Sequence, residues 1–504
     1  MRTLQAIGPF PLVVLGLTVF VVLTAVGHRW RVWYRRTGSG ARGWLPAWAA
    51  ALLGVAVLVT YRTWALTAHP VTLATGFFVV VAISTVVLLL LAAYGADHLD
   101  RLPVASGTVV AVVPVYNEEP AVLRETVAAL LAAEPPLRRI YVVDDGSKVP
   151  VEPFERPGVV LLRQRNGGKR AAQVNALRRL DPAQVDFLVT VDSDSVVRPD
   201  FLTHALRAFS DPRVQGVTSV VTVRTMENLW SRITDLEMVG GIFLIRRARA
   251  ALGAVTPTSG ALAVYRADVV LDNLEDYLAS GTFSDDRRLA HYCLLRGKVV
   301  ALNDVVVDTD MPSTLKGIWR QRLRWYKGYW RYLPWELAHL EGPALGLRVF
   351  NTVVVTVYPF ALVWILVILP LSGAGLFWQP FALWGALLYA QGVTYAWGRP
   401  GMPARQRMLS WLLLTPLVLL FQVLLVRPAM YAALFSVRSE RWDGHRSQGA
   451  VITPLPVQAA QATANPAPRP LPAGSPDRDR HRVAFNRDPQ RARHHGSGRL
   501  TGTR

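Results

Sequence analysis

The sequence predicts an α/β domain with a mostly parallel sheet, embedded in an α-helical transmembrane protein. Strand-like apolar runs alternate with helix-like patterns across residues 105–312, and this alternation is typical of a parallel sheet. Apolar segments near the roughly 20 residues that cross a bilayer lie on both sides of that region. The 504 residues are 51% hydrophobic and carry a formal net charge of +20, which is typical of a membrane protein with basic cytoplasmic loops.

Composition narrows the possible classes of function. The single cysteine, Cys293, excludes an internal disulfide and a metal site built from several cysteines. A basic chain can bind nucleic acid, but the long apolar segments favour the lipid bilayer as the partner. We therefore expect a bilayer partner and no nucleic acid, while the oligomeric state is left open.

In residues 1–100, apolar segments at about 10–27, 45–61 and 71–94 predict about three transmembrane helices. The connector after the first helix is rich in arginine, whereas the next connector holds only Arg62. Positively charged connectors stay in the cytoplasm, so we expect residues 28–44 to be cytoplasmic and the N-terminus to be external. Three crossings then place the α/β domain in the cytoplasm.

The α/β domain carries polar side chains where its predicted strands end. Strand-like runs are expected at 108–116, 138–147, 158–165 and 188–191. The last run ends in Asp192 and Asp194, which strand alternation places on one side of the chain. Ligands of open α/β sheets bind beyond the carboxyl ends of the strands, and two carboxylates there suit Mg²⁺ or Mn²⁺ with a diphosphate. An isolated Asp-Ser-Asp is more often a solvated turn, so this prediction depends on its companions.

Four companions complete a candidate nucleotide-diphosphate site. Asp145 follows the second strand, where it can accept a hydrogen bond from a uracil N–H or a ribose hydroxyl. Lys169 follows two glycines that allow close backbone approach, and its charge can neutralise a phosphate. Asp285 and Asp286 are expected at a helix N-terminus, where one of them can act as the general base for an attacking hydroxyl. Simple N-capping explains that last pair equally well.

Residues 313–345 predict amphipathic interfacial helices, because aromatic residues interleave with arginine and lysine there. Gln321, Arg324 and Trp325 follow the spacing i, i+3, i+4 and therefore share one helix face. That face can offer an amide, a cation for phosphate and a ring on which a sugar stacks. Taken alone, the pattern also fits a plain interfacial helix.

Residues 346–436 predict the C-terminal transmembrane helices, at about 349–372, 376–397 and 407–436. The last of them carries Arg427-Pro428, where we expect a break into two short segments that keeps the C-terminus in the cytoplasm. Residues 437–452 are a possible gating segment. Residues 453–504 predict a disordered basic tail that can contact anionic lipid.

Seven motifs give the chain a resemblance to the processive family-2 glycosyltransferases, most of all to hyaluronan synthases, with chitin-oligosaccharide and cellulose synthases as relatives. In chain order they are VVPVYNEE (112–119), VVDDGS (142–147), NGGK (166–169), DSDS (192–195), SGALAVYR (259–266), SDDRRLAHYCLLRGK (284–298) and DTDMPSTLKGIWRQRLRW (308–325). The resemblance implies a GT-A catalytic domain, a UDP-sugar donor and inversion at the anomeric carbon.

The resemblance also implies roles on the donor side. It makes Asp145 a uridine contact and Lys169 a diphosphate contact. Asp192 becomes a nucleotide and metal-shell residue, and Asp194 becomes the metal ligand. Gln321 and Arg324 of the Q-x-x-R-W motif meet the pyrophosphate.

On the acceptor side, the resemblance gives Asp286 the place of the catalytic base, with Asp285 beside it. Trp325 closes the acceptor pocket, next to the loop that holds Ser259 and Gly260. Trp442 falls in the gating segment.

Three departures from the family pattern concern the acceptor side. Ser284 stands where hyaluronan synthases usually carry glycine, and the loop Pro257-Thr258-Ser259 lacks the cysteine commonly found near it. Residues 441–446 only approximate the W-G-T-R gating segment of the family.

We therefore expect a multi-pass plasma-membrane polysaccharide synthase with a cytoplasmic catalytic domain. It would transfer sugars from UDP-GlcNAc, UDP-GlcA or both to a growing polysaccharide, and move the polymer outward. The same diphosphate machinery fits N-acetylglucosamine with glucuronate, N-acetylglucosamine alone, or glucose. Two alternatives are a non-processive transferase that glycosylates a lipid carrier and a membrane transporter whose α/β domain only senses nucleotide. The Q-x-x-R-W motif argues against the first, and the intact base carboxylates argue against the second.

Overall fold

A computed structural model gives the structure of the chain and describes residues 49, 52–59, 73–281, 284–373, 379–437, 441–442 and 445–446. The first predicted transmembrane helix, the arginine-rich connector, most of the gating segment and the predicted disordered tail lie outside the described residues.

A mixed eight-stranded sheet forms the centre of the α/β domain. Its strands are β1 (Val109–Val115), β2 (Arg139–Asp144), β3 (Val159–Arg163), β4 (Phe187–Val191), β5 (Ser195–Val197), β6 (Val214–Val223), β7 (Leu262–Arg266) and β8 (Lys298–Thr309). Their order is β3-β2-β1-β4-β7-β6-β8-β5. The first four strands are parallel, as are β6 and β8. Strand β7 runs antiparallel to β4 and β6, and β5 runs antiparallel to β8.

The central strands are rich in apolar residues, as is usual where helices cover both faces of a sheet. Every residue of β1, β4 and β6 is buried. The helices of this domain are α4 (Pro120–Leu131), α5 (Lys169–Leu177), α6 (Phe201–Phe209), α7 (Leu229–Glu237), α8 (Leu244–Ala250), α9 (Ala267–Leu271), α10 (Leu274–Ala279) and α11 (Asp285–Arg296), with the π-helical turn η2 (Met238–Phe243) between α7 and α8.

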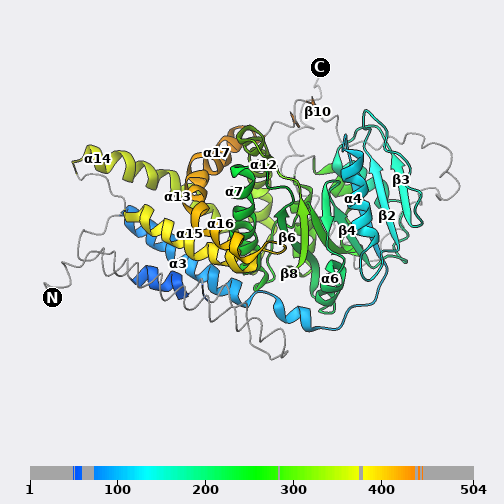
Figure 1. Cartoon of the computed structure of the whole chain (residues 1–504), viewed down its shortest axis with the longest axis horizontal. Coiled ribbons are helices and arrows are strands. Elements are labelled where there is room, and N and C mark those ends of the chain that lie inside the picture. The colour runs from blue at the N-terminus through cyan, green and yellow to red at the C-terminus, as the bar shows by residue number, and fades with distance from the viewer. Residues whose placement is uncertain are drawn as a thin grey trace, which may run out of the picture.

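The remaining helices gather on the side of the molecule opposite α4 and β3 (Figure 1). They are α3 (Leu73–Tyr94), η1 (Asp97–Arg101), α12 (Leu315–His339), α13 (Gly342–Val363), η3 (Trp364–Ile368), α14 (Leu369–Leu371), α15 (Gln379–Gly398), α16 (Ala404–Phe421), η4 (Gln422–Val426) and α17 (Arg427–Phe435). Among the described residues, three stretches are long and apolar enough to cross a membrane: Val80–Arg101, Gly342–Ile368 and Ala404–Phe435.

The predicted break at Arg427-Pro428 is wrong. Residues 404–435 form one continuous helical stretch, in which η4 is a π-helical turn placed directly before α17. Proline removes one backbone donor and crowds the preceding turn, and a wider π turn accommodates both effects without ending the helix. The side of the membrane on which the tail lies stays a prediction.

Buried ion pairs attach this helical group to the α/β domain. The fully buried guanidinium of Arg247 on α8 donates to both carboxylate oxygens of Asp97, each at 2.7 Å, and to the carbonyl of Ala92 at 2.6 Å. At the end of α15, Arg399 pairs with Asp235 of α7 at 3.1 Å. Breaking a buried pair leaves an uncompensated charge, so these contacts fix the two parts against each other.

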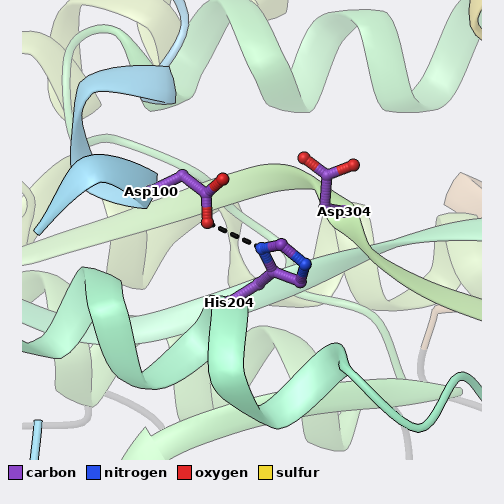
Figure 2. A group of neighbouring side chains, drawn as sticks. All are labelled: Asp100, His204 and Asp304. Atoms are coloured by element: carbon purple, nitrogen blue, oxygen red, sulfur yellow. Dashed lines mark hydrogen bonds and ion pairs between the residues drawn. The ribbon is translucent and has the colours of Figure 1, made fainter. Parts of the chain in front are cut away.

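A cluster of Asp100, His204 and Asp304 joins η1 to α6 and β8 (Figure 2). Their possible ligand atoms lie within 4.8 Å of one another, but the shortest contact is a hydrogen bond of 2.6 Å between Asp100 Oδ1 and His204 Nδ1. Arg207 also contacts Asp100. The hydrogen bond to Asp100 raises the pKa of His204, which favours the charged imidazolium. We therefore interpret the cluster as an ion-pair junction.

Helix α12 crosses the beginning of α11 at Gly328. A Cβ atom at this position would overlap the side chain of Ser284, so only glycine allows the approach. Ser284 itself has φ 54° and ψ 57°, a left-handed conformation that glycine adopts without steric cost. This contact holds α12 against the helix that begins with Asp285 and Asp286.

We expect Gly328→Ala to destabilise the protein by about 1–3 kcal/mol, the usual cost of overpacking a close contact. Adding Ser284→Gly should restore stability, because the nearest atom of residue 284 is then its Cα at 3.9 Å. Thermal unfolding of the purified proteins measures both effects. Gly346→Ala is the matched control, since no atom of the described part of the chain lies within 4 Å of a Cβ at that helix position. Equal losses in the single and the double variant would contradict this contact.

Candidate active site

One cavity of about 1250 Å³ lies where the strand ends, α11 and α12 meet. Predicted site residues that line it are Asp145, Lys169, Asp192, Asp194, Ser259, Gly260, Asp285, Asp286, Gln321, Arg324 and Trp325. Trp442 is the exception: only its backbone is described, in strand β9 (Arg441–Trp442), paired with β10 (His445–Arg446). Its gating role stays a prediction.

Asp145 organises the loop between β3 and α5. Its Oδ1 accepts hydrogen bonds from Gln164 Nε2 at 2.7 Å and from the Gly167 amide at 2.9 Å, and its Oδ2 accepts one from the Gly168 amide at 2.8 Å. Burial raises the pKa of Asp145, and these donors oppose that rise. The carboxylate thus shapes the loop that precedes Lys169. Its contact with uridine stays a prediction.

Lys169, the first residue of α5, lies between two carboxylates. Its Nζ is 2.6 Å from Asp192 Oδ1 and 2.8 Å from Asp285 Oδ2. Burial opposes its charge, but the two carboxylates outweigh burial and raise the pKa of Lys169. A Cβ on Gly260 would lie 3.4 Å from this Nζ, so Gly260 lies beside Lys169 in the cavity. Its predicted acceptor role is untested.

Asp194 belongs to a group of three carboxylates. Its Oδ1 accepts hydrogen bonds from Thr309 at 3.0 Å and Ser195 at 3.2 Å. Burial, then the charge of Asp192 and also that of Glu118, raise the pKa of Asp194 to about 6. A divalent cation would relieve this repulsion, and hard oxygen ligands of this kind fit Mg²⁺ or Mn²⁺.

Glu118 is a cavity residue that the sequence reasoning missed. Its Oε2 accepts a hydrogen bond of 2.8 Å from Ser193, the residue between Asp192 and Asp194. It follows strand β1 in the motif VVPVYNEE, and a polar residue just beyond a parallel strand was the available signal.

The adjacent carboxylates of Asp285 and Asp286 have different surroundings. Burial opposes ionisation of Asp285, but Lys169 and then Arg170 hold its pKa below the usual range. Burial, and then the charge of Asp285, raise the pKa of Asp286 to about 6. Asp286 Oδ1 accepts a hydrogen bond from the Arg287 amide at 2.8 Å. Asp286 is therefore the better proton acceptor near neutral pH.

Gln321, Arg324 and Trp325 line the cavity together, as their spacing on α12 predicts. Gln321 donates to Met311 Sδ at 3.3 Å, while its buried Oε1 has no hydrogen-bond partner among the residues that the structure describes. The guanidinium of Arg322, which pairs with Glu237, lies 4.2 Å from the ring centroid of Trp325. That cation fixes the indole on the cavity wall.

The same cavity extends among the C-terminal helices. Residues of α13, α15, α16, η4 and α17 line this part, namely Asn351, Val355, Trp384, Leu388, Gln391, Thr415, Val418, Gln422, Arg427 and Met430. A continuous space therefore leads from the strand ends of the sheet to helices that can cross a membrane.

Comparison with known proteins places the α/β domain in a family. Residues 106–328 match the model of the glycosyltransferase like family 2. The hyaluronan synthase of Streptococcus pyogenes is 35% identical over 243 residues, which are 44% of this chain and 57% of that protein. An N-acetylglucosaminyltransferase of Rhizobium meliloti (strain 1021) is 32% identical over 257 residues, 47% of this chain and 59% of that protein. The chain thus matches somewhat over half the length of these relatives.

One solved structure is similar at a lower level. The mannosyltransferase PcManGT from Pyrobaculum calidifontis, in complex with GDP-Man and Mn²⁺, shares 18% identity with a TM-score of 0.44, covering 73% of this chain and 100% of its own. A likeness at this level carries no argument about function. The family match, by contrast, spans the cavity residues from Glu118 to Trp325. Residues 106–328 therefore match a family-2 glycosyltransferase domain, which in this chain is built on a mixed eight-stranded sheet.

Proposed function

We propose that this chain is a processive, membrane-embedded polysaccharide synthase that transfers sugars from UDP-sugar donors to a growing polymer. One observation carries the proposal: a single cavity joins the strand-end carboxylates, Lys169 and the face of α12 to the C-terminal helices. Similarity to a hyaluronan synthase and to an N-acetylglucosaminyltransferase supports it.

On the donor side, Asp145 would contact the uridine, and Lys169, Gln321 and Arg324 would bind the diphosphate. Asp194, with Asp192 beside it, would hold Mg²⁺ or Mn²⁺, which supplies charge stabilisation for the leaving UDP. Lys169 and Arg324 both line the cavity, and Asp192 and Asp285 hold Lys169 in place. Preorganised charge is most effective where negative charge develops.

On the acceptor side, Asp286 would take the proton of the acceptor hydroxyl as its oxygen attacks C1 of the donor sugar. The new C1–O bond forms while the bond from C1 to the diphosphate oxygen breaks, and the electron pair leaves with UDP. Attack from the face opposite the diphosphate inverts the anomeric carbon. Trp325, with Ser259 nearby, would hold the acceptor sugar.

We place the protein in the plasma membrane as a multi-pass protein, with its catalytic domain in the cytoplasm where UDP-sugars are made. The three apolar stretches and the bilayer-type composition support this placement. Continuity of the cavity into the helices favours a polymerase over a transferase that glycosylates a lipid carrier once per encounter. A nucleotide-sensing transporter would need no base such as Asp286.

The test is to incubate the purified full chain with UDP-GlcNAc, UDP-GlcA and UDP-glucose, singly and in pairs, with Mg²⁺ or Mn²⁺ and with chelator. UDP release and product length are followed, and linkage-specific glycosidases identify the polymer. We expect metal-dependent UDP release and a long product from one donor or one pair. A product of single additions would refute processivity, and no UDP release from any donor would refute the enzyme.

Asp286→Asn should lower UDP release by on the order of 10²–10⁴-fold, because the amide keeps the shape but cannot accept a proton. Donor binding, measured by calorimetry, should persist. In the unmodified enzyme, the rate should rise with pH through about 6, as Asp286 loses its proton. Asp285→Asn is the matched comparison and should bind the donor at least as tightly as the unmodified enzyme, because a diphosphate then competes with one carboxylate fewer for Lys169. A larger rate loss in Asp285→Asn would exchange the two roles.

Trp325→Ala should shorten the polymer while leaving donor binding near normal. Stacking on an aromatic ring is worth roughly 0.5–1.5 kcal/mol, and 1.4 kcal/mol changes a ratio of elongation to release about tenfold. Gel electrophoresis of the product measures its length. Trp319→Ala is the control, since Trp319 lies on the same helix but does not line the cavity. If both variants lower the yield equally without shortening the product, Trp325 only anchors the helix.

A further inference from the structure

Glu336 is a fully buried carboxylate on α12 that does not line the cavity. Its Oε1 accepts hydrogen bonds from Arg287 Nη1 at 2.9 Å and His291 Nε2 at 2.8 Å, and its Oε2 lies 2.5 Å from Arg348 Nε. Arg287 and His291 belong to α11, whereas Arg348 belongs to α13. One carboxylate therefore links the helix of the proposed base, the interfacial helix and a helix that can cross the membrane.

The only negative charge in this group of four side chains is that of ionised Glu336. Burial opposes its ionisation, but Arg287, then His291 and Arg348, hold the pKa of Glu336 at about 2. Burial lowers the pKa of His291 to about 4, so the imidazole is neutral and donates its Nε2–H. The two guanidiniums thus share one anion, and its removal would leave buried cations uncompensated.

Arg287 connects this group to the proposed base. It follows Asp286 directly, its amide donates to Asp286 Oδ1, and its side chain borders the cavity. Its guanidinium lies 5.8 Å from the ring centroid of Tyr329, and that of Arg348 lies 3.9 Å from the same centroid. Other charged or titratable groups that act on Asp286 are Asp285, Lys169, Arg246 and Tyr265.

We propose that Glu336 is a positioning residue for the transfer step, because it binds and neutralises the guanidinium of Arg287, the residue after Asp286, and ties it to Arg348 of α13. This inference rests on the proposed function of Asp286 as general base. Without the charge of Glu336, Arg287 is an unbalanced cation next to Asp286. Such a cation stabilises the ionised carboxylate and weakens it as a base.

The test is the pH dependence of kcat in Glu336→Gln, which keeps the size of the side chain and removes its charge. We expect the acid limb to move down by about one pH unit, the effect of one nearby charge, and the plateau kcat to fall. KM for the UDP-sugar should stay within about twofold of the KM of the unmodified protein, since the contacts of Glu336 are with Arg287, His291 and Arg348 and not with the residues proposed to bind the donor. Loss of active protein alone would lower kcat without moving the acid limb.

Two further variants keep the outcome decisive. Arg287→Met should move the acid limb up, and combining it with Glu336→Gln should leave the limb where Arg287→Met alone places it. Glu336→Asp keeps the charge and should keep the acid limb near that of the unmodified protein. If Glu336→Gln does not fold, an unmoved limb in Arg287→Met overturns the inference.

The two proposals fail in different ways. An unmodified chain that releases no UDP overturns the proposed function, and this inference with it. An active unmodified chain whose acid limb is the same in Glu336→Gln, or whose KM rises in proportion to the loss of kcat, overturns the inference alone.

Discussion

The catalytic part of this molecule depends on the single charge of Lys169. Its ammonium joins three elements that are distant in sequence: it begins α5, contacts Asp192 after β4, and contacts Asp285 at the start of α11. Without this ammonium, the partly buried cavity would have less positive charge to balance its carboxylates, which are those of Glu118, Asp192, Asp194 and Asp285. A diphosphate would compete with these carboxylates for the same ammonium. Diphosphate binding at Lys169, which we propose, would therefore be physically linked to the placement of α11.

Local patterns predicted much of the site. Polar residues just beyond apolar strands placed Asp145, Asp192 and Asp194 at one edge of the sheet, and i, i+3, i+4 spacing placed Gln321 and Trp325 on one helix face. The pairings among these residues were not predictable. Lys169 meets Asp285, and Ser193 meets Glu118, only because separate strands and helices pack together, and no sequence period encodes such contacts.

Predictions from the local sequence failed where tertiary packing accommodates a residue that does not favour the local backbone structure. Pro428 suggested a broken helix, but the π-helical turn η4 absorbs the proline and the helix continues. Serine at position 284 does not by itself suggest a left-handed backbone; the glycine that hyaluronan synthases usually carry there was the available signal, and the close crossing of α12 at Gly328 accompanies this conformation. Strand β7 likewise reverses direction within a sheet whose first four strands are parallel, because strand direction depends on the connections and not on the apolar pattern.

Asp285 and Asp286 are neighbours with the same side chain, but the charged groups around them shift their pKa values in opposite directions. Asp285 faces Lys169 and Arg170 and is held ionised, whereas Asp286 faces Asp285 and keeps a raised pKa. The nearest guanidinium to Asp286 in sequence, that of Arg287, is bound by Glu336, which also binds Arg348 of α13. The basicity of Asp286 is therefore set partly by a carboxylate outside the cavity. Since the same carboxylate contacts Arg348 of α13, a shift of α13 would change the charge next to Asp286, and Glu336 would thereby link the position of a membrane-type helix to the proton transfer that we propose at Asp286.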